Sequence, residues 1–242
     1  MTKFYLRTTA VVILVILVFI VFGCNKNRED RANENAIELM GKQKYAEAIK
    51  EFSTIVKGDK NYLPAYYNRA ICYSFLNKNR EAINDLNFVI SKQKFDEEAY
   101  LNRAILFENQ KKYEDAIKDY THLLTINPRN SKALHFRGIC KYYIKDYSGA
   151  VTDYNLAIKY GLNSSGVYYN IAVALDCLEQ YPKAIKYYDK AIKIDAKLER
   201  AYFARGIANL KNGNKEAAIA DIKQSEKLGF KKAAHVLKEI IG

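Results

Sequence analysis

Apolar residues recur along this chain of 242 residues at helical spacing, and the pattern itself repeats every 34 residues. Alanine returns at this interval with no insertion or deletion, and a β-branched residue follows it each time. The six alanines are Ala48, Ala82, Ala116, Ala150, Ala184 and Ala218. A fixed period held over six copies indicates a repeat protein, in which similar small units stack on one another.

Each unit, numbered from its own first residue, predicts two helices. Positions 4, 8 and 11 fall on one face of a first helix, and positions 20, 24 and 27 fall on one face of a second. Small residues at positions 8 and 20 let the two helices approach closely. The six units span residues 29–62, 63–96, 97–130, 131–164, 165–198 and 199–232. One helix pair cannot bury its apolar face alone, so consecutive units must stack.

The two ends of the repeat region differ from its middle. The first unit has a polar start and only Ala32 at position 4, as expected of a terminal repeat. After the sixth unit, residues 233–242 carry an apolar stripe that includes Val236 and Ile240. The stripe predicts a capping helix over the last unit. Pro64 and Pro182 stand at expected first turns of helices, where the missing N–H of proline is harmless.

This pattern resembles the tetratricopeptide repeat (TPR), a helix–turn–helix unit of 34 residues. The resemblance covers residues 29–232. It implies an all-α fold, a right-handed superhelical solenoid of six TPR units whose first helices line a concave groove. It also implies a scaffold for protein–protein interaction, which binds a segment of a partner protein in that groove.

The N-terminal residues 1–23 combine a basic start with an uninterrupted apolar run from Ala10 to Phe22. Thirteen residues are short for a membrane span of about 20 but suit the core of a signal peptide. The sequence "VFGC" then resembles a bacterial lipobox, which implies cleavage before Cys24 and acylation of its thiol.

This resemblance implies a lipid-anchored protein of the bacterial cell envelope, facing the periplasm or the exterior. Residues 24–28 form a short polar tether, so the repeats are expected to work close to the membrane surface. The alternative is an uncleaved single-pass anchor in the inner membrane, over roughly residues 4–23.

Opposite charges recur together at positions 7 and 23. In the fifth unit both change at once, to Ile171 and Tyr187. Charges that appear and vanish as a pair indicate contact between the two helices of a unit, and bidentate guanidinium–carboxylate geometry suits a half-buried seam. The predicted structural ion pairs are Arg69 with Asp85, Arg103 with Asp119, Arg137 with Asp153 and Arg205 with Asp221.

The other face of the first helices, which lines the groove in the resembled family, combines asparagine with aromatic residues. Asparagine recurs at position 6, where its amide can bind the backbone of a partner segment, or can bond to water or to a neighbouring helix. The sequence leaves both roles open. The predicted partner-binding residues are Tyr67, Asn68, Phe75, Asn102, His135, Tyr143, Tyr169, Asn170 and Phe203. They point away from the seam between the two helices, so their replacement is expected to spare the fold.

The formal charge of +12 comes from lysines spread along the chain, which predicts mostly a solvated surface. A basic rim forms at the turns between first and second helices, at Lys42, Lys44, Lys78, Lys111, Lys112 and Lys145. This rim supports an alternative function, binding to an anionic surface or nucleic acid. Nucleic acid is nevertheless not the expected partner.

Residues that carry catalysis are missing from the pattern. The three histidines are not at helical spacing from one another, and no phosphate-binding glycine loop is present. Cys72 and Cys140 both fall at position 10, two units apart, too far for a disulfide, and suit small core positions. The sequence therefore predicts no enzyme, no metal, no cofactor and no small-molecule substrate. The expected partner is another protein, whose identity the sequence does not specify.

Overall fold

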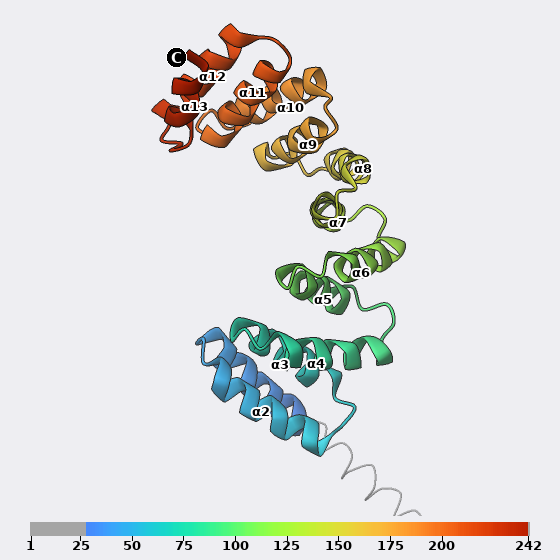
Figure 1. The fold of residues 1–242 in the computed structure, drawn as a ribbon. Coiled ribbons are helices and arrows are strands. Elements are labelled where there is room, and N and C mark those ends of the chain that lie inside the picture. Colours follow the sequence, from blue (N-terminus) through green and yellow to red (C-terminus); the bar gives the residue numbers. More distant parts are fainter. Residues whose placement is uncertain (1–27, 242) are drawn as a thin grey trace, which may run out of the picture. The chain divides into compact units, whose positions relative to one another are not determined.

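A computed structural model describes residues 28–241, and all regular structure in this range is α-helical. A helix over residues 28–41 comes first, and short turns connect it and the helices that follow (Figure 1). The following helices are α2 (Tyr45–Gly58), α3 (Leu63–Phe75), α4 (Asn79–Lys92), α5 (Glu97–Asn109), α6 (Tyr113–Ile126), α7 (Ser131–Tyr143), α8 (Tyr147–Lys159), α9 (Ser165–Cys177), α10 (Tyr181–Ile194), α11 (Glu199–Lys211), α12 (Lys215–Lys227) and α13 (Ala233–Ile241).

Each predicted repeat corresponds to one pair of these helices. The helix over 28–41 packs with α2, α3 with α4, α7 with α8, α9 with α10 and α11 with α12, and α13 packs on α12 as the predicted cap. Consecutive pairs such as α3–α4, α7–α8 and α9–α10 pack along their lengths. The expected all-α fold of TPR helix pairs with a capping helix is therefore confirmed. The chain divides into two compact units, Met1–Arg103 and Ala104–Gly242, with the division inside α5.

The core of the first compact unit lies where the small residues predicted at positions 8 and 20 meet large ones. Ala36 and Ala48 are fully buried and pack with Phe52 and Cys72. Alanine at these positions lets the two helices approach closely, and the phenyl ring of Phe52 fills the remaining space. The thiol of Cys72 is buried here, as its place in the repeat predicts, and burial raises its pKa to about 11.

The second compact unit has the same organisation with tyrosine as the large residue. The buried rings of Tyr154 and Tyr188 pack with Val167 and Ile171. Gly138 makes room for the first of these rings, because a Cβ atom at this glycine would lie 2.6 Å from Cε1 of Tyr154. The small residue at position 8 is thus a packing requirement of this unit.

The turn between first and second helices has one conformation in all six repeats. Position 15 adopts positive φ each time, at Gln43, Asn77, Lys111, Lys145, Glu179 and Gly213. This left-handed residue ends the first helix and starts the reversal into the second. After the turn, proline fits where predicted, since α10 begins with proline at one of its first two positions, as α3 does.

The N-terminal predictions lie outside the described residues. Residues 1–23 and Cys24 precede residue 28, so the signal peptide, the alternative anchor and lipidation stay predictions. Among residues 28–241, no helix combines the length and the apolar character that crossing a membrane requires.

Candidate partner-binding groove

First helices line one side of the second compact unit. α9 contacts α7 and α11, the first helices of the neighbouring repeats. A cavity of about 330 Å³ opens between α7, α8 and α9. Its walls are Ile139, Tyr142, Tyr143, Tyr154, Tyr169, Asn170 and Val173. The structure thus brings three of the predicted partner-binding residues to one cavity, namely Tyr143, Tyr169 and Asn170.

The polar wall of this cavity is tied to the preceding repeat. Nδ2 of Asn170 lies 3.1 Å from Nε2 of His135. Burial lowers the pKa of His135, because the charged imidazolium loses hydration in this position. The neutral ring can accept the hydrogen bond that the Asn170 amide donates. The imidazole therefore fixes the orientation of the asparagine at the wall.

The aromatic wall is also ordered by contacts between repeats. The ring of Tyr143 stacks on Tyr113 of α6, with 4.8 Å between the ring centroids and 8° between the ring planes. Tyr143 nevertheless remains 57% exposed, so its other side can receive a ligand. The hydroxyl of Tyr142 accepts a long hydrogen bond of 3.8 Å from Sγ of Cys177. Tyr142 and Tyr154 line the cavity although the sequence did not single them out.

The first compact unit has a second cavity of about 330 Å³, at the start of α3. It is lined by Leu63, Pro64, Tyr67, Asn68, Val89, Gln93, Asp96 and Glu98. Tyr67 and Asn68 are predicted partner-binding residues. Phe75 lies at the other end of α3, where it stacks on Tyr45 with centroids 4.6 Å apart and stays 59% exposed. The predicted residues of this unit therefore lie at two places along one helix.

The asparagines of position 6 bond to the neighbouring first helix. Nδ2 of Asn102 donates to the hydroxyl of Tyr67 at 2.9 Å and also to the carbonyl of Glu98 at 2.8 Å. Nδ2 of Asn68 donates to Oδ1 of Asn33 at 3.4 Å. With Asn170, all three asparagines reach position 5 of the preceding repeat. Of the two roles left open by the sequence, the structure shows the bond to a neighbouring helix.

This arrangement corrects the expectation that replacements on this face spare the fold. Each asparagine joins two repeats, so its loss leaves a partly buried partner without its hydrogen bond. Phe203 departs from the expectation in another way. Its ring packs against Phe230, 4.8 Å between centroids, beside the turn that leads to the cap, and it does not line the cavity of α7 and α9.

A weak sequence signal for these bonds lies in the comparison of neighbouring repeats. Where position 6 is asparagine, position 5 of the preceding repeat is a polar partner, at Asn33, Tyr67 and His135. Where position 6 is Ala204, the preceding repeat has Tyr169, whose ring carries the guanidinium of Arg200 at 4.9 Å. Tyrosine thus precedes asparagine at Tyr67 and alanine at Tyr169, so a comparison of neighbouring repeats indicates the contact without specifying it.

The seam between the two helices of a repeat contains bidentate ion pairs. Arg69 donates from Nε and Nη2 to the two carboxylate oxygens of Asp85, at 2.8 and 2.7 Å. Arg137 binds Asp153 with the same distances, and Arg205 binds Asp221 at 2.9 and 2.6 Å. The carboxylates are buried and the guanidiniums half-buried. Arg103 and Asp119 belong to different compact units, so their pairing stays a prediction.

The same arginines also reach the preceding repeat, which the sequence interpretation missed. Nη1 of each donates to position 25 of the repeat before it, at Ser53, Asn87, Thr121 and Asp189. In the fifth repeat, which lacks the arginine, the hydroxyl of Tyr187 donates to Asn155 at that position instead, at 3.2 Å. The seam therefore stabilises both the repeat and its junction with the previous one.

The basic rim is partly neutralised in the first repeat. Nζ of Lys42 lies 2.6 Å from a carboxylate oxygen of Glu38, and Nζ of Lys44 lies 3.2 Å from Glu47. Lys111 and Lys145 occupy the left-handed position of their turns and are exposed. Exposed ion pairs of this kind contribute little to stability, and they reduce the charge available to a partner.

The sequence and the fold both have relatives among known proteins. Residues 23–201 match the family described as the tetratricopeptide repeat protein 21 C-terminal ARM domain, and residues 178–229 match a tetratricopeptide repeat family. No curated protein sequence matches the chain.

Similar solved structures are TPR-containing or related bacterial proteins of low sequence identity. MamA from Desulfovibrio magneticus RS-1 is 21% identical with a TM-score of 0.67, covering 69% of this chain and 95% of that one. YrrB, described as a TPR protein with an unusual peptide-binding site, is 15% identical with a TM-score of 0.69, covering 77% and 97%. The pilF protein of Pseudomonas aeruginosa is 15% identical with a TM-score of 0.69, covering 89% and 99%.

At these identities the likeness to solved structures shows a shared fold. The family match is broader, because it spans residues 23–201 and thus well over half of the chain. Together with helix pairs that repeat every 34 residues, it shows that the chain belongs to the tetratricopeptide repeat family.

Proposed function

We propose that this chain is a membrane-tethered scaffold that binds an extended segment of a partner protein along its first helices. The cavity between α7, α8 and α9 is the observation that carries the proposal. Four tyrosines and the oriented amide of Asn170 line it. They provide a large apolar area and a polar group held in one orientation, which suits the binding of a peptide.

The state of the polar groups supports binding over catalysis. His135 is engaged with Asn170, and burial of the imidazole disfavours the charged form that a general acid needs. The YrrB structure, described as having a peptide-binding site, shares this fold. Among the predicted residues, Tyr143 is the strongest candidate for direct contact, because one side of its ring is stacked and the other is exposed.

The tether rests on the sequence of the N-terminus. The apolar run from Ala10 to Phe22 and the "VFGC" motif support a lipid on Cys24, on the periplasmic or outer face of a bacterial envelope. The intact mass of the mature protein tests this point. Loss of residues 1–23 with added acyl chains is expected, and Cys24→Ala is expected to leave the full-length precursor. A mature chain that retains Met1 would favour the uncleaved anchor.

Site-directed crosslinking in the native membrane tests the groove. A photo-crosslinking amino acid placed at position 143 is expected to capture a defined segment of one partner, identified by mass spectrometry of the crosslinked peptides. The same amino acid at position 152, exposed on the outer side of α8, is the matched control and is expected not to capture it.

A second variant links the capture to the cavity itself. Val173→Arg fills the cavity from the α9 side and leaves the contact between His135 and Asn170 in place. Capture from position 143 is then expected to fall by roughly tenfold or more, while circular dichroism and thermal unfolding show a folded chain. Equal capture from positions 143 and 152, or capture that survives Val173→Arg, contradicts the groove as the binding site.

A further inference from the structure

Positive charge is concentrated in the last quarter of the chain. Residues 181–242 hold fourteen Lys and Arg against seven Asp and Glu, a net charge of +7, whereas residues 28–180 have a net charge of +2. The excess therefore belongs to a particular region and departs from the even distribution that the sequence first suggested. The region includes α10, α11, α12 and α13.

Lysines form a stripe along the outer side of α10. Lys183, Lys186, Lys190 and Lys193 follow one another at alternating intervals of three and four residues, and Lys197 continues the series in the next turn. This spacing places the side chains on one helix face, over about 15 Å from the first to the fourth. All five lysines are exposed, and none lines the cavity between α7, α8 and α9.

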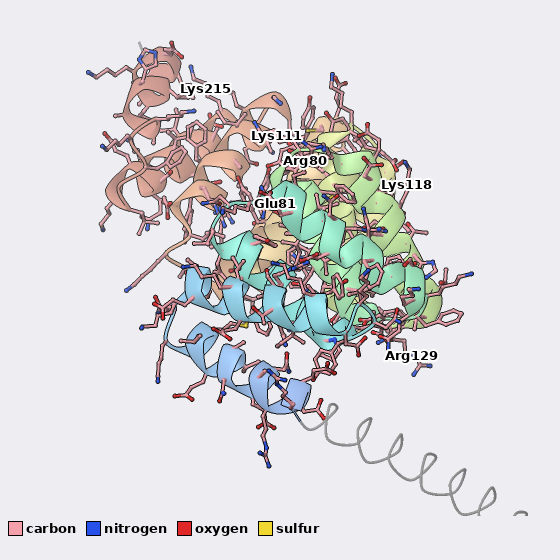
Figure 2. All side chains as sticks on the ribbon, turned by 90° about the horizontal axis from the view of Figure 1, so that it is seen from below. Arg80, Glu81, Lys111, Lys118, Arg129 and Lys215 are labelled. Carbon is pink, nitrogen blue, oxygen red and sulfur yellow. The ribbon has the colours of Figure 1, made fainter. Side chains whose placement is uncertain are left out.

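The other repeats show that this stripe is not a general feature of the family surface. The five lysines occupy positions 19, 22, 26, 29 and 33 of the fifth repeat. The same positions carry a net charge of +1, −1, +1, +1 and +2 in the first, second, third, fourth and sixth repeats, against +5 in the fifth. In the third repeat, for example, Lys118 and Arg129 point outward from α6 and the turn after it (Figure 2), but Asp115 is among them.

Among the described residues, no lysine of the stripe forms a salt bridge, although the carboxylate of Asp195 lies between Lys193 and Lys197 and accepts a hydrogen bond from the backbone N–H of Lys197. Within residues 28–241, the salt bridges of the structure include none of these five lysines. The nearest acid on the same helix, Asp189, is engaged by Arg205 of the next repeat. Nζ of Lys190 instead lies 4.8 Å from the ring centroid of Tyr187 and 5.6 Å from that of Tyr168. Five like charges that repel one another indicate a surface shaped for an anionic partner.

We propose that the outer face of α10 is a second interaction surface, which docks on an anionic lipid bilayer. Lysine without arginine suits diffuse attraction to head groups, because arginine is the residue favoured for bidentate binding of single phosphates. Ile194, 49% exposed, stands beside the stripe, and an apolar side chain there can enter the boundary between head groups and acyl chains. The N-terminal anchor proposed above would hold the chain at a membrane, which would bring this surface close to a bilayer.

This proposal assumes the N-terminal anchor, which would bring α10 close to the bilayer. It does not depend on whether the groove binds a partner protein. It assigns the lysines an orienting role, in which electrostatic attraction holds the second compact unit against the bilayer. Attraction to anionic lipid contributes for each basic residue near the surface and falls within a Debye length, so it depends on both lipid charge and salt.

Amine labelling of the full-length chain on vesicles tests this surface. The protein is added to vesicles of phosphatidylcholine alone and to vesicles that also contain phosphatidylglycerol, and the proposed N-terminal anchor is expected to associate with both. The acylation rate of each lysine by a membrane-impermeant reagent is then read by peptide mass spectrometry. Lys186, Lys190 and Lys193 are expected to react about threefold or more slowly on the anionic vesicles. Lys118 and Lys159, at equivalent positions on α6 and α8, are expected to react equally on both.

A matched pair of charge variants separates the stripe from net charge. Lys183→Glu with Lys186→Glu is expected to abolish the protection of Lys190 and Lys193 on anionic vesicles. Lys118→Glu with Lys159→Glu changes the net charge by the same amount and is expected to preserve it. Val173→Arg, which fills the cavity, is also expected to preserve it, so failure of the groove and failure of this surface are distinguishable.

Three results would overturn the proposal. Equal labelling of the α10 lysines on both vesicle types shows that the bilayer does not cover them. Protection that persists in high salt shows that charge is not the cause. Protection by a DNA duplex at physiological salt, without protection on anionic vesicles, assigns the stripe to nucleic acid instead.

Discussion

The two helices of a repeat are connected by different side chains in the fifth repeat than in the fourth and sixth repeats. In the fourth and sixth, a guanidinium and a carboxylate join the two helices, through Arg137 with Asp153 and Arg205 with Asp221. In the fifth, Ile171 is fully buried at the arginine position and Tyr187 stands at the aspartate position. The seam therefore tolerates either a charged or an apolar pair, provided that both members change together.

The difference teaches which interaction the repeats must keep. All three repeats keep a side-chain hydrogen bond from the seam to position 25 of the preceding repeat. It runs from Arg137 to Thr121, from Tyr187 to Asn155 and from Arg205 to Asp189. The fifth repeat lacks the ion pair between its two helices, whereas a donor that reaches the preceding repeat is present in all three repeats. In a stacked fold, stability depends on the junctions between neighbours as much as on each repeat.

Placing the charge of one repeat into the seam of another should give the largest effect. Ile171→Arg puts a guanidinium into a site that is 0% exposed and has Tyr187 in place of a carboxylate. An unpaired buried charge of this kind is expected to lower the free energy of unfolding by about 3–5 kcal/mol. Urea unfolding followed by circular dichroism measures the loss.

A second variant decides whether the seam is modular. Ile171→Arg with Tyr187→Asp recreates the pair of the fourth and sixth repeats and is expected to recover at least half of the loss. If the double variant is no more stable than Ile171→Arg alone, surroundings other than these two positions determine the chemistry of the seam.

Removing a partner from a charged seam should have a somewhat smaller effect. Arg137→Ala leaves the carboxylate of Asp153, 1% exposed, without its bidentate partner. Nζ of Lys141 lies 2.9 Å from the same carboxylate and remains, so a loss of about 2 kcal/mol is expected instead of the full cost of an unpaired buried charge. A double-mutant cycle with Asp153→Ala measures the coupling. Zero coupling energy would mean that the two side chains stabilise the repeat independently.

The repeat architecture could be predicted from the sequence because its causes are local. The alanine at position 20 and the small residue at position 8 are fixed by close helix packing, which Gly138 against Tyr154 illustrates. The ion pairs of the seam could also be predicted, because arginine at position 7 and aspartate at position 23 occur in the same repeats and are both absent from the fifth. Arg137 with Asp153 is one of these pairs. A 34-residue period turns one chain into six aligned examples, which supply the comparison that a single domain lacks.

The groove was predicted less well because its contacts join different repeats. Asn170 and His135 are 35 residues apart and occupy different positions of the repeat, so alignment of equivalent positions does not pair them. Tyr142 and Tyr154 escaped notice for a related reason. Both are partly or fully buried, yet a cavity between three helices exposes an edge of each, and its existence depends on how the helices pack.

The junction between the fourth and fifth repeats should weaken on mild acidification. Burial lowers the pKa of His135 in the folded chain below that of the unfolded chain, near 6.5, so the unfolded state binds more protons between these two values. Stability is therefore full above the unfolded pKa and falls as pH decreases toward the folded pKa. The junction between the fifth and sixth repeats, with Tyr169 in the equivalent place, lacks this group.

Urea unfolding at a series of pH values tests the histidine. His135→Gln retains an amide oxygen that can accept from Asn170 but cannot titrate. The loss of stability from about pH 7 to about pH 5.5 is expected to be smaller in this variant than in the unaltered chain. Identical profiles for the unaltered chain and His135→Gln would assign the pH dependence to other groups.

The turns of the same three repeats should give the smallest effect, and one of opposite sign. The sixth repeat places Gly213 at the left-handed position with φ of 86°, whereas the fourth and fifth place Lys145 and Glu179 there, with φ of 67° and 59°. A side chain with a Cβ atom is strained in this region, and glycine is not.

Lys145→Gly keeps the backbone hydrogen bond from residue 145 to the carbonyl of Tyr142, and it is expected to raise the free energy of unfolding by about 0.5–1 kcal/mol. Glu179→Gly should stabilise similarly, and Gly213→Ala should destabilise by a comparable amount, all measured by urea unfolding. If both glycine variants are less stable than the unaltered chain, the entropy that glycine adds to the unfolded state outweighs the strain at these turns.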